Sequence, residues 1–192
     1  DTSKPKTNAK VTVPVVPANL CVPTLSSQLP EEVLDEFDGS VFLRLIASND
    51  VDWFARVSVV KQLDVALTKD TFEAVVLSDP SRVEKLVQFF SSRIMDTNIK
   101  VSQAACEAVV NLLEAHPQAT DSYLQDPIAN LLQLTNTTTK RDDQKSFAQT
   151  ALATIERNLA GKTLFDICLR LLESLDSRIK LGSIREMRNL ML

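Results

Sequence analysis

A six-residue tract occurs twice in this chain and separates two apolar helical patterns in both places. Residues 96–101 read DTNIKV, and residues 176–181 read DSRIKL. An apolar pattern with helical spacing ends at the Asp of each tract, and another begins after the Lys. A turn that recurs between two helices is typical of helical repeat proteins, which usually bind partners along a row of such turns. The tract therefore predicts more about binding than about catalysis.

Four pairs of helices are predicted from Pro30 to the end of the sequence. Asp79 is a predicted N-cap, with Pro80 at the first helical position. The apolar residues of each helix recur at the spacing of a buried helical face. In the second and fourth pairs these faces are Val83, Leu86, Val87, Phe90 and Ile94; Val101, Ala105, Ala108 and Leu112; Leu164, Cys168, Leu171 and Leu175; and Leu181, Ile184, Met187 and Met191.

The predicted turns within these pairs centre near Asp50, Asp96, Thr138 and Asp176, at spacings of 46, 42 and 38 residues. These spacings lie inside or close to the roughly 40–47 residues of HEAT repeats. Each helix pair leaves one apolar flank, and stacking of the next pair covers it. We therefore expect an all-α fold, an α-solenoid of about four HEAT-like helix pairs over residues 26–192. The alternative is an irregular helical bundle.

The first 25 residues differ in composition from the rest. Lysines alternate with prolines there, and proline blocks helix formation, so residues 1–25 are predicted to be an extended or disordered linker. The chain begins at Asp1 rather than Met, and we expect it to be a piece of a longer protein.

Composition sets limits on the class of partner. Hydrophobic residues make up 44% of the chain, which is enough to bury a continuous core. The net charge of −4 gives no broad attraction to nucleic acid, and no apolar run approaches the length of a membrane helix. Cys106 and Cys168 fall inside helical patterns, where we expect free thiols in a reducing cytosol.

The sequence offers little for catalysis. His116 is the only His and precedes Pro117 at a predicted helix end, where capping or exposure is expected. There is no Gly-rich phosphate loop, no nucleophile elbow and no Cys–His pairing at ligand spacing. We expect a non-enzymatic protein that needs neither a metal nor another cofactor.

The segment at residues 50–56, DVDWFAR, follows the first predicted helix and falls at the first turn within a pair. An acidic turn followed by Asp-Trp-x-x-Arg at this place resembles the opening of TOG domains, the tubulin-binding HEAT arrays of CLASP, crescerin and the microtubule polymerases. The DTNIKV tract resembles the second turn of such domains. The resemblance covers about residues 31–192, although four helix pairs are fewer than TOG domains usually contain.

The resemblance implies a flat paddle whose inter-helix turns form one edge that grips αβ-tubulin or microtubule ends. On this reading Trp53, followed by Arg56, anchors the first turn. Cations along the edge would meet the acidic surface of tubulin. The domain would be monomeric and cytoplasmic, on microtubules, with the spindle, centrosome or cilium as further sites. The cations implied are Lys100, Lys140, Arg141, Arg178 and Lys180.

Structural explanations stand beside these functional ones. Trp53 could be a core residue between the first two helices, and Arg56 could form an ion pair with a carboxylate such as Asp52. The lysines could be solvated charges near helix starts. A HEAT-type scaffold that binds another protein or peptide in an apolar groove would leave Trp53 buried. An assembly module would use the unfinished apolar face at Met187 and Met191.

Overall fold

The structure, a computed structural model, describes residues 37–137 and 142–191, and every regular element in these ranges is helical. The prediction of an all-α fold is confirmed. The elements are α1 (Gly39–Ile46), α2 (Trp53–Ala66), a π-helical turn η2 (Glu73–Leu77), α3 (Pro80–Ile94), α4 (Ile99–Ala115), α5 (Pro117–Thr120), a 3₁₀ turn η3 (Asp121–Tyr123), α6 (Gln125–Thr135), α7 (Asp142–Asn158), α8 (Gly161–Leu171) and α9 (Ser177–Leu190).

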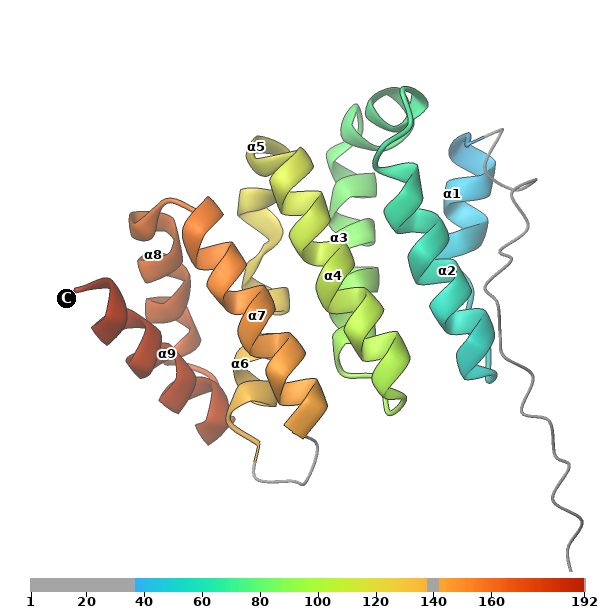
Figure 1. Cartoon of the computed structure of the whole chain (residues 1–192). Coiled ribbons are helices and arrows are strands. Elements are labelled where there is room, and N and C mark those ends of the chain that lie inside the picture. The colour runs from blue at the N-terminus through green and yellow to red at the C-terminus, as the bar shows by residue number, and fades with distance from the viewer. Residues whose placement is uncertain (1–36, 138–141, 192) are drawn as a thin grey trace, which may run out of the picture.

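The longer helices form two layers. In one layer α2 packs against α4, and α4 packs against α7; in the other α1 packs against α3, and α3 against α6. Helices that follow each other within a pair, such as α3 and α4, also pack together across the layers. Figure 1 shows that the connections within the pairs, from α1 to α2, α3 to α4, α6 to α7 and α8 to α9, all lie along its lower edge.

The last pair departs from this arrangement. Helix α9 packs against α8 and α6, whereas the second helices of the two preceding pairs extend the α2 layer. Gly182 allows α9 to approach α6 closely, because a Cβ atom there would lie 2.8 Å from Asn136 Nδ2 and 3.0 Å from Leu132 Cβ. The absence of a side chain at this position therefore sets the distance between the two helices.

Polar caps define where several helices begin. Asp79 caps α3 by accepting a hydrogen bond from the Ser81 N–H at 3.0 Å, and Pro80 takes the first helical position, as predicted. Asp52 caps α2 in the same way, and Asn98 caps α4. Each cap satisfies a backbone N–H that has no partner inside its helix.

The predicted core faces of α3 and α4 are confirmed, because every residue named for them is buried. The prediction for the fourth pair is partly wrong. Leu164, Cys168 and Leu171 are buried in α8, but Leu175 is exposed. In α9 the buried face consists of Ile179, Gly182 and Ser183, while Leu181, Ile184 and Met191 face solvent. Met187, the fourth residue predicted for this face, is partly buried against the core. The helical period was predicted correctly, but most of the face assigned to the core lies on the solvent side of α9.

Several parts of the sequence prediction fall outside the described residues. These are the linker at residues 1–25, the helix start at Pro30, and the turn centre at Thr138 with the cations Lys140 and Arg141. Within the described part of the chain, no helix has the length and apolar character needed to cross a bilayer.

Candidate partner-binding edge

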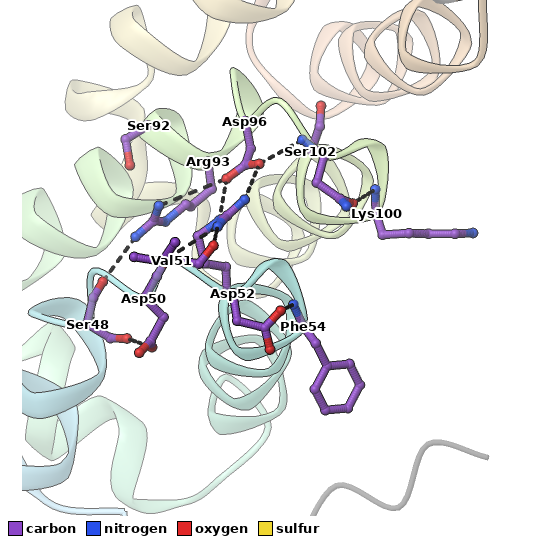
Figure 2. Close-up of polar contacts among 12 residues, drawn as sticks. Ser48, Asp50, Val51, Asp52, Phe54, Ser92, Arg93, Asp96, Lys100 and Ser102 are labelled. Carbon is purple, nitrogen blue, oxygen red and sulfur yellow. Dashed lines mark hydrogen bonds and ion pairs between the residues drawn. The ribbon is translucent and has the colours of Figure 1, made fainter. Parts of the chain in front are cut away.

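A cluster of three charged residues joins the first two turns of the lower edge. Arg56 of α2 donates from Nε to Asp96 Oδ2 at 2.8 Å and from Nη2 to Asp96 Oδ1 at 2.9 Å. Arg93 of α3 places its Nη1 4.0 Å from Asp96 Oδ2. We call Arg56, Arg93 and Asp96 the turn clamp; Figure 2 shows Arg93 and Asp96 together between the two turns.

The turn clamp also holds the backbone of the first turn. Arg56 Nη1 donates to the carbonyl oxygen of Val51 at 2.6 Å, and Arg93 Nη2 donates to the carbonyl oxygen of Ser48 at 3.0 Å. The side chains of Arg56 and Asp96 are 13% and 7% exposed. A two-pronged contact between such shielded groups is stronger and more directional than a surface ion pair. The first turn is therefore fixed to the second.

The protonation of Asp96 reflects this setting. Burial by itself raises the pKa of the carboxyl group, but hydrogen bonds from Arg56 and from the Asn98 N–H outweigh it, so the pKa lies below the usual range. Asp96 therefore stays ionised at neutral pH, and its single negative charge faces the guanidinium groups of both Arg56 and Arg93.

Further hydrogen bonds link the other turns. Gln144, near the start of α7, donates to the carbonyl oxygen of Asp96 at 3.3 Å. Gln133 of α6 donates to Asp176 Oδ2, in the turn before α9, at 3.0 Å. These contacts connect neighbouring pairs at the same edge of the molecule.

An exposed apolar cluster lies beside the turn clamp at the start of α2. Trp53 and Phe54 are 42% and 44% exposed, and Val51 is almost fully exposed. The Trp53 and Phe54 rings meet edge to face with centroids 6.0 Å apart. We call Val51, Trp53 and Phe54 the apolar tip. Since it begins α2 and adjoins the backbone that Arg56 holds, the tip is supported by a fixed turn.

The structure distinguishes the predicted cations from one another. Lys100 and Lys180 are exposed, and neither forms an ion pair with a described residue. Arg178 pairs with Asp176, with Nη2 2.5 Å from Oδ2. Arg56 forms the ion pair that was considered as an alternative, but with Asp96 rather than Asp52. Lys140 and Arg141 lie outside the described residues.

Lys100 and the apolar tip lie at the starts of two helices that pack together, α4 and α2. In Figure 2 the side chains of Lys100 and Phe54 both extend away from the turn clamp. Sequence reasoning named Trp53 but assigned no role to Phe54 or Val51. The signal that could have identified them is the run Val51-Asp52-Trp53-Phe54, in which large apolar residues surround a capping Asp.

The described residues contain no cluster of three or more metal-ligating side chains. Burial raises the pKa of Cys106 to about 12 and that of Cys168 to about 11, so both thiols are protonated and unreactive at neutral pH. His116 is half-buried at the end of α4 and stacks on Phe72, with ring centroids 5.3 Å apart. The exposed side chains at this edge include the apolar tip, Lys100 and Lys180, together with the carboxylates Asp50 and Asp52 at the first turn.

Comparison of this chain with protein-family models, with curated proteins and with solved structures finds no match.

Proposed function

We propose that this chain is a TOG-like module of HEAT-type helix pairs that binds αβ-tubulin or microtubule ends. The binding surface is the edge formed by the turns within the pairs, which we call the turn edge. The observation that carries the proposal is the apolar tip, because it exposes Trp53 and Phe54 together at that edge. A protein with no further use for these two rings would gain from burying them. The cellular setting that goes with this function is the microtubule cytoskeleton of the cytoplasm.

The physical basis of binding is a rigid aromatic anchor with a nearby cation. An interfacial Trp buries a large area and loses little side-chain entropy, so such residues become hot spots. Lys100 supplies a positive charge that steers an acidic surface toward the tip. Arg56 acts as a positioning residue, because its guanidinium group binds Asp96 and the Val51 carbonyl oxygen rather than facing solvent.

Size-exclusion chromatography with purified tubulin tests the proposal. We expect the wild-type chain to co-elute with tubulin at low salt and less completely at moderate salt, because exposed charges are screened. Trp53→Ala should remove the complex, since truncation of a hot-spot Trp costs about 2 kcal/mol or more. Val65→Ala is the matched control, because Val65 is another exposed apolar residue near the opposite end of α2.

The result contradicts the proposal if the folded wild-type chain does not bind tubulin at low salt. Equal binding by the wild type and the Trp53→Ala variant would assign binding to another surface. Circular dichroism of each variant establishes that the helices are retained.

A second candidate function is a protein scaffold that does not bind tubulin. The observation that favours it is a groove of about 580 Å³ between α4 and α7, whose apolar lining includes Val110, Phe147 and Ala151. An extended or helical peptide could place apolar side chains there. Binding that is lost in a Phe147→Asp variant and retained in Trp53→Ala would favour this function.

A further inference from the structure

Helix α9 exposes a regular apolar stripe at one end of the molecule. Leu181 and Ile184 are each about half exposed, and Met191 is more exposed still. The opposite side of the helix, at Ile179, Gly182 and Ser183, is buried against the rest of the fold. Figure 1 shows α8 and α9 at the end of the array farthest from α1 and α2. The stripe is thus separated from the apolar tip by the length of the array.

The positions in this stripe follow the spacing of a coiled-coil seam. Leu181, Ile184, Arg188 and Met191 are separated by three, four and three residues, which matches alternating a and d positions of a heptad. Arg188 is exposed and occupies an a position, and the exposed Arg185 follows a d position as an e residue. We call Leu181, Ile184, Arg185, Arg188 and Met191 the α9 seam.

The charge of the seam is of one sign. Arg185 and Arg188 lie within it, and Lys180 flanks it at a g position. The only acidic residue of α9 is Glu186, which lies on the inner side. Burial and the nearby Glu156 raise the pKa of Glu186, whereas Arg185 opposes this shift. Because Glu186 is half-buried on the inner side, no carboxylate of α9 itself lies among the exposed positions of the seam. A partner that buries the stripe must therefore supply carboxylates at its margins.

We propose that the α9 seam docks an amphipathic helix of another protein, one whose apolar stripe is flanked by Asp or Glu. Charges at e and g positions determine which helices pair, and a charged residue at an a position disfavours contact with its own copy. Two copies of α9 would bring Arg188 and the flanking cations together, so the charge pattern opposes self-association. This proposal is independent of tubulin binding at the turn edge.

Selection from a displayed library of amphipathic helices tests the proposal without presuming a sequence. Each helix carries Leu at its a and d positions, and Glu, Gln or Lys is allowed at the e and g positions. The complete chain serves as the target. We expect Glu to be enriched when the wild-type chain is the target and Lys to be enriched when the target is the double variant Arg185→Glu, Arg188→Glu. That reversal is a gain of new preference, which loss of folding cannot produce.

The affinity of the selected acidic peptide for the chain and its variants is then measured by fluorescence anisotropy. We expect Ile184→Glu to weaken binding at least about tenfold, because it places a charge in the apolar stripe, and Trp53→Ala to leave it unchanged. Retained tubulin binding in Ile184→Glu separates this surface from the turn edge.

Three results would overturn the proposal. The first is a selection with no enrichment or with no preference for charge. The second is a dimer, detected by light scattering, that Ile184→Glu dissociates, since it would make a second copy the occupant. The third is sedimentation with phosphatidylserine vesicles that depends on Leu181 and Ile184 in the absence of peptide enrichment, which would assign the seam to a lipid surface.

Discussion

The two copies of the recurring tract have similar sequences, with Asp, Ile and Lys at the same positions, but different structures. In the first copy, Asp96 is shielded and receives Arg56 from a preceding helix pair, while Asn98 caps α4. In the second, Asp176 itself caps α9, its side chain is 24% exposed, and its ion-pair partner is Arg178, two residues further along. Both Asp residues thus contact the preceding helix pair, but Asp96 does so through an ion pair with Arg56, whereas Asp176 does so through a hydrogen bond from Gln133 and forms its ion pair within its own turn.

This difference changes where equivalent residues point. Helix α4 begins at Ile99, the fourth residue of its tract, and α9 begins at Ser177, the second residue of its tract. Val101 is buried in α4, but its counterpart Leu181 is exposed in α9. Lys100 and Lys180 are both exposed, yet they are the second and the fourth residue of their helices. A repeated sequence therefore fixes the presence of a turn, while its surroundings decide the register of the helix that follows.

The largest expected difference comes from removing each Asp. Asp96→Ala leaves Arg56 and Arg93 without their carboxylate, and breaking such a shielded pair lowers the free energy of unfolding by about 3 kcal/mol. Asp176→Ala removes a helix cap and a more exposed pair, for a loss of about 1 kcal/mol. Urea denaturation of both variants measures the difference. Equal losses would mean that the turn clamp contributes no more than an ordinary cap.

A smaller effect is expected where α9 contacts α6. Gly182→Ala would place a Cβ atom 2.8 Å from Asn136 Nδ2 and should lower the free energy of unfolding by about 1–2 kcal/mol through overpacking, despite the better helix propensity of Ala. Gly161→Ala is the matched control, because a Cβ atom added there would lie 4.0 Å from Leu190 Cδ2, at an ordinary contact distance. A Gly182→Ala variant as stable as the control would show that α9 can move away from α6 at little cost.

Acid should reveal the role of Asp96. Its pKa is lowered in the folded state, so its contribution to stability is complete above the unfolded value of about 3.9 and is lost as the pH falls through the folded pKa. Between about pH 5 and pH 3, the wild type should lose more stability than Asp96→Asn. Thermal unfolding across this range measures the difference, and parallel curves would contradict the assignment.

The same thermal unfolding experiment, repeated at high salt, distinguishes the acid-dependent stability contributed by Asp96 from that contributed by Asp176. The pKa of Asp176 is also lowered, chiefly by its hydrogen bond from Arg178, but this pair is more exposed than the turn clamp. In about 1 M salt we expect the acid-dependent loss from Asp176 to shrink more than that from Asp96.

The smallest expected effect concerns the two lysines. If the turn edge binds tubulin, Lys100→Ala should slow association a few-fold, because Lys100 is at the start of α4, which packs against the helix that carries Trp53 and Phe54. Lys180→Ala should have less effect, because Lys180 lies in the second tract, away from the tip. Stopped-flow association rates at two salt concentrations measure both. A larger effect of Lys180→Ala would place the binding site nearer α9.

Helix positions were predictable because the apolar spacing of α3 and α4 coincides with their buried faces. Polar signals such as Asp79-Pro80 were sufficient to place a helix start. The side of α9 was not predictable in the same way, because its exposed stripe at Leu181 and Ile184 is as regular as a core face. Its buried side contains Gly182 and Ser183, which are not strongly apolar. These small residues belong to the core only because they allow α6 to approach α9 closely.

The candidate site was predictable where it depends on neighbours in the sequence and not where it depends on the packing of distant helices. The position of Trp53 at a turn indicated exposure, since the first residue of a capped helix faces solvent on much of its surface. The partner of Arg56 was not accessible from the sequence, because Asp52 is near in the chain while Asp96 is near only after α2 and α4 have packed together. The η2, α5 and η3 turns carry no strong periodic pattern and were not predicted.

The turn clamp also has a mechanical consequence. Arg56 and Arg93 both contact the Asp96 carboxylate, and both also donate to carbonyl oxygens of the first turn. A displacement of the first turn therefore acts directly on the second turn. These contacts hold the distance between the first and second turns constant. If the edge binds a partner as proposed, a partner that spans both turns must match this fixed spacing, and its curvature would then affect binding as well as its chemistry.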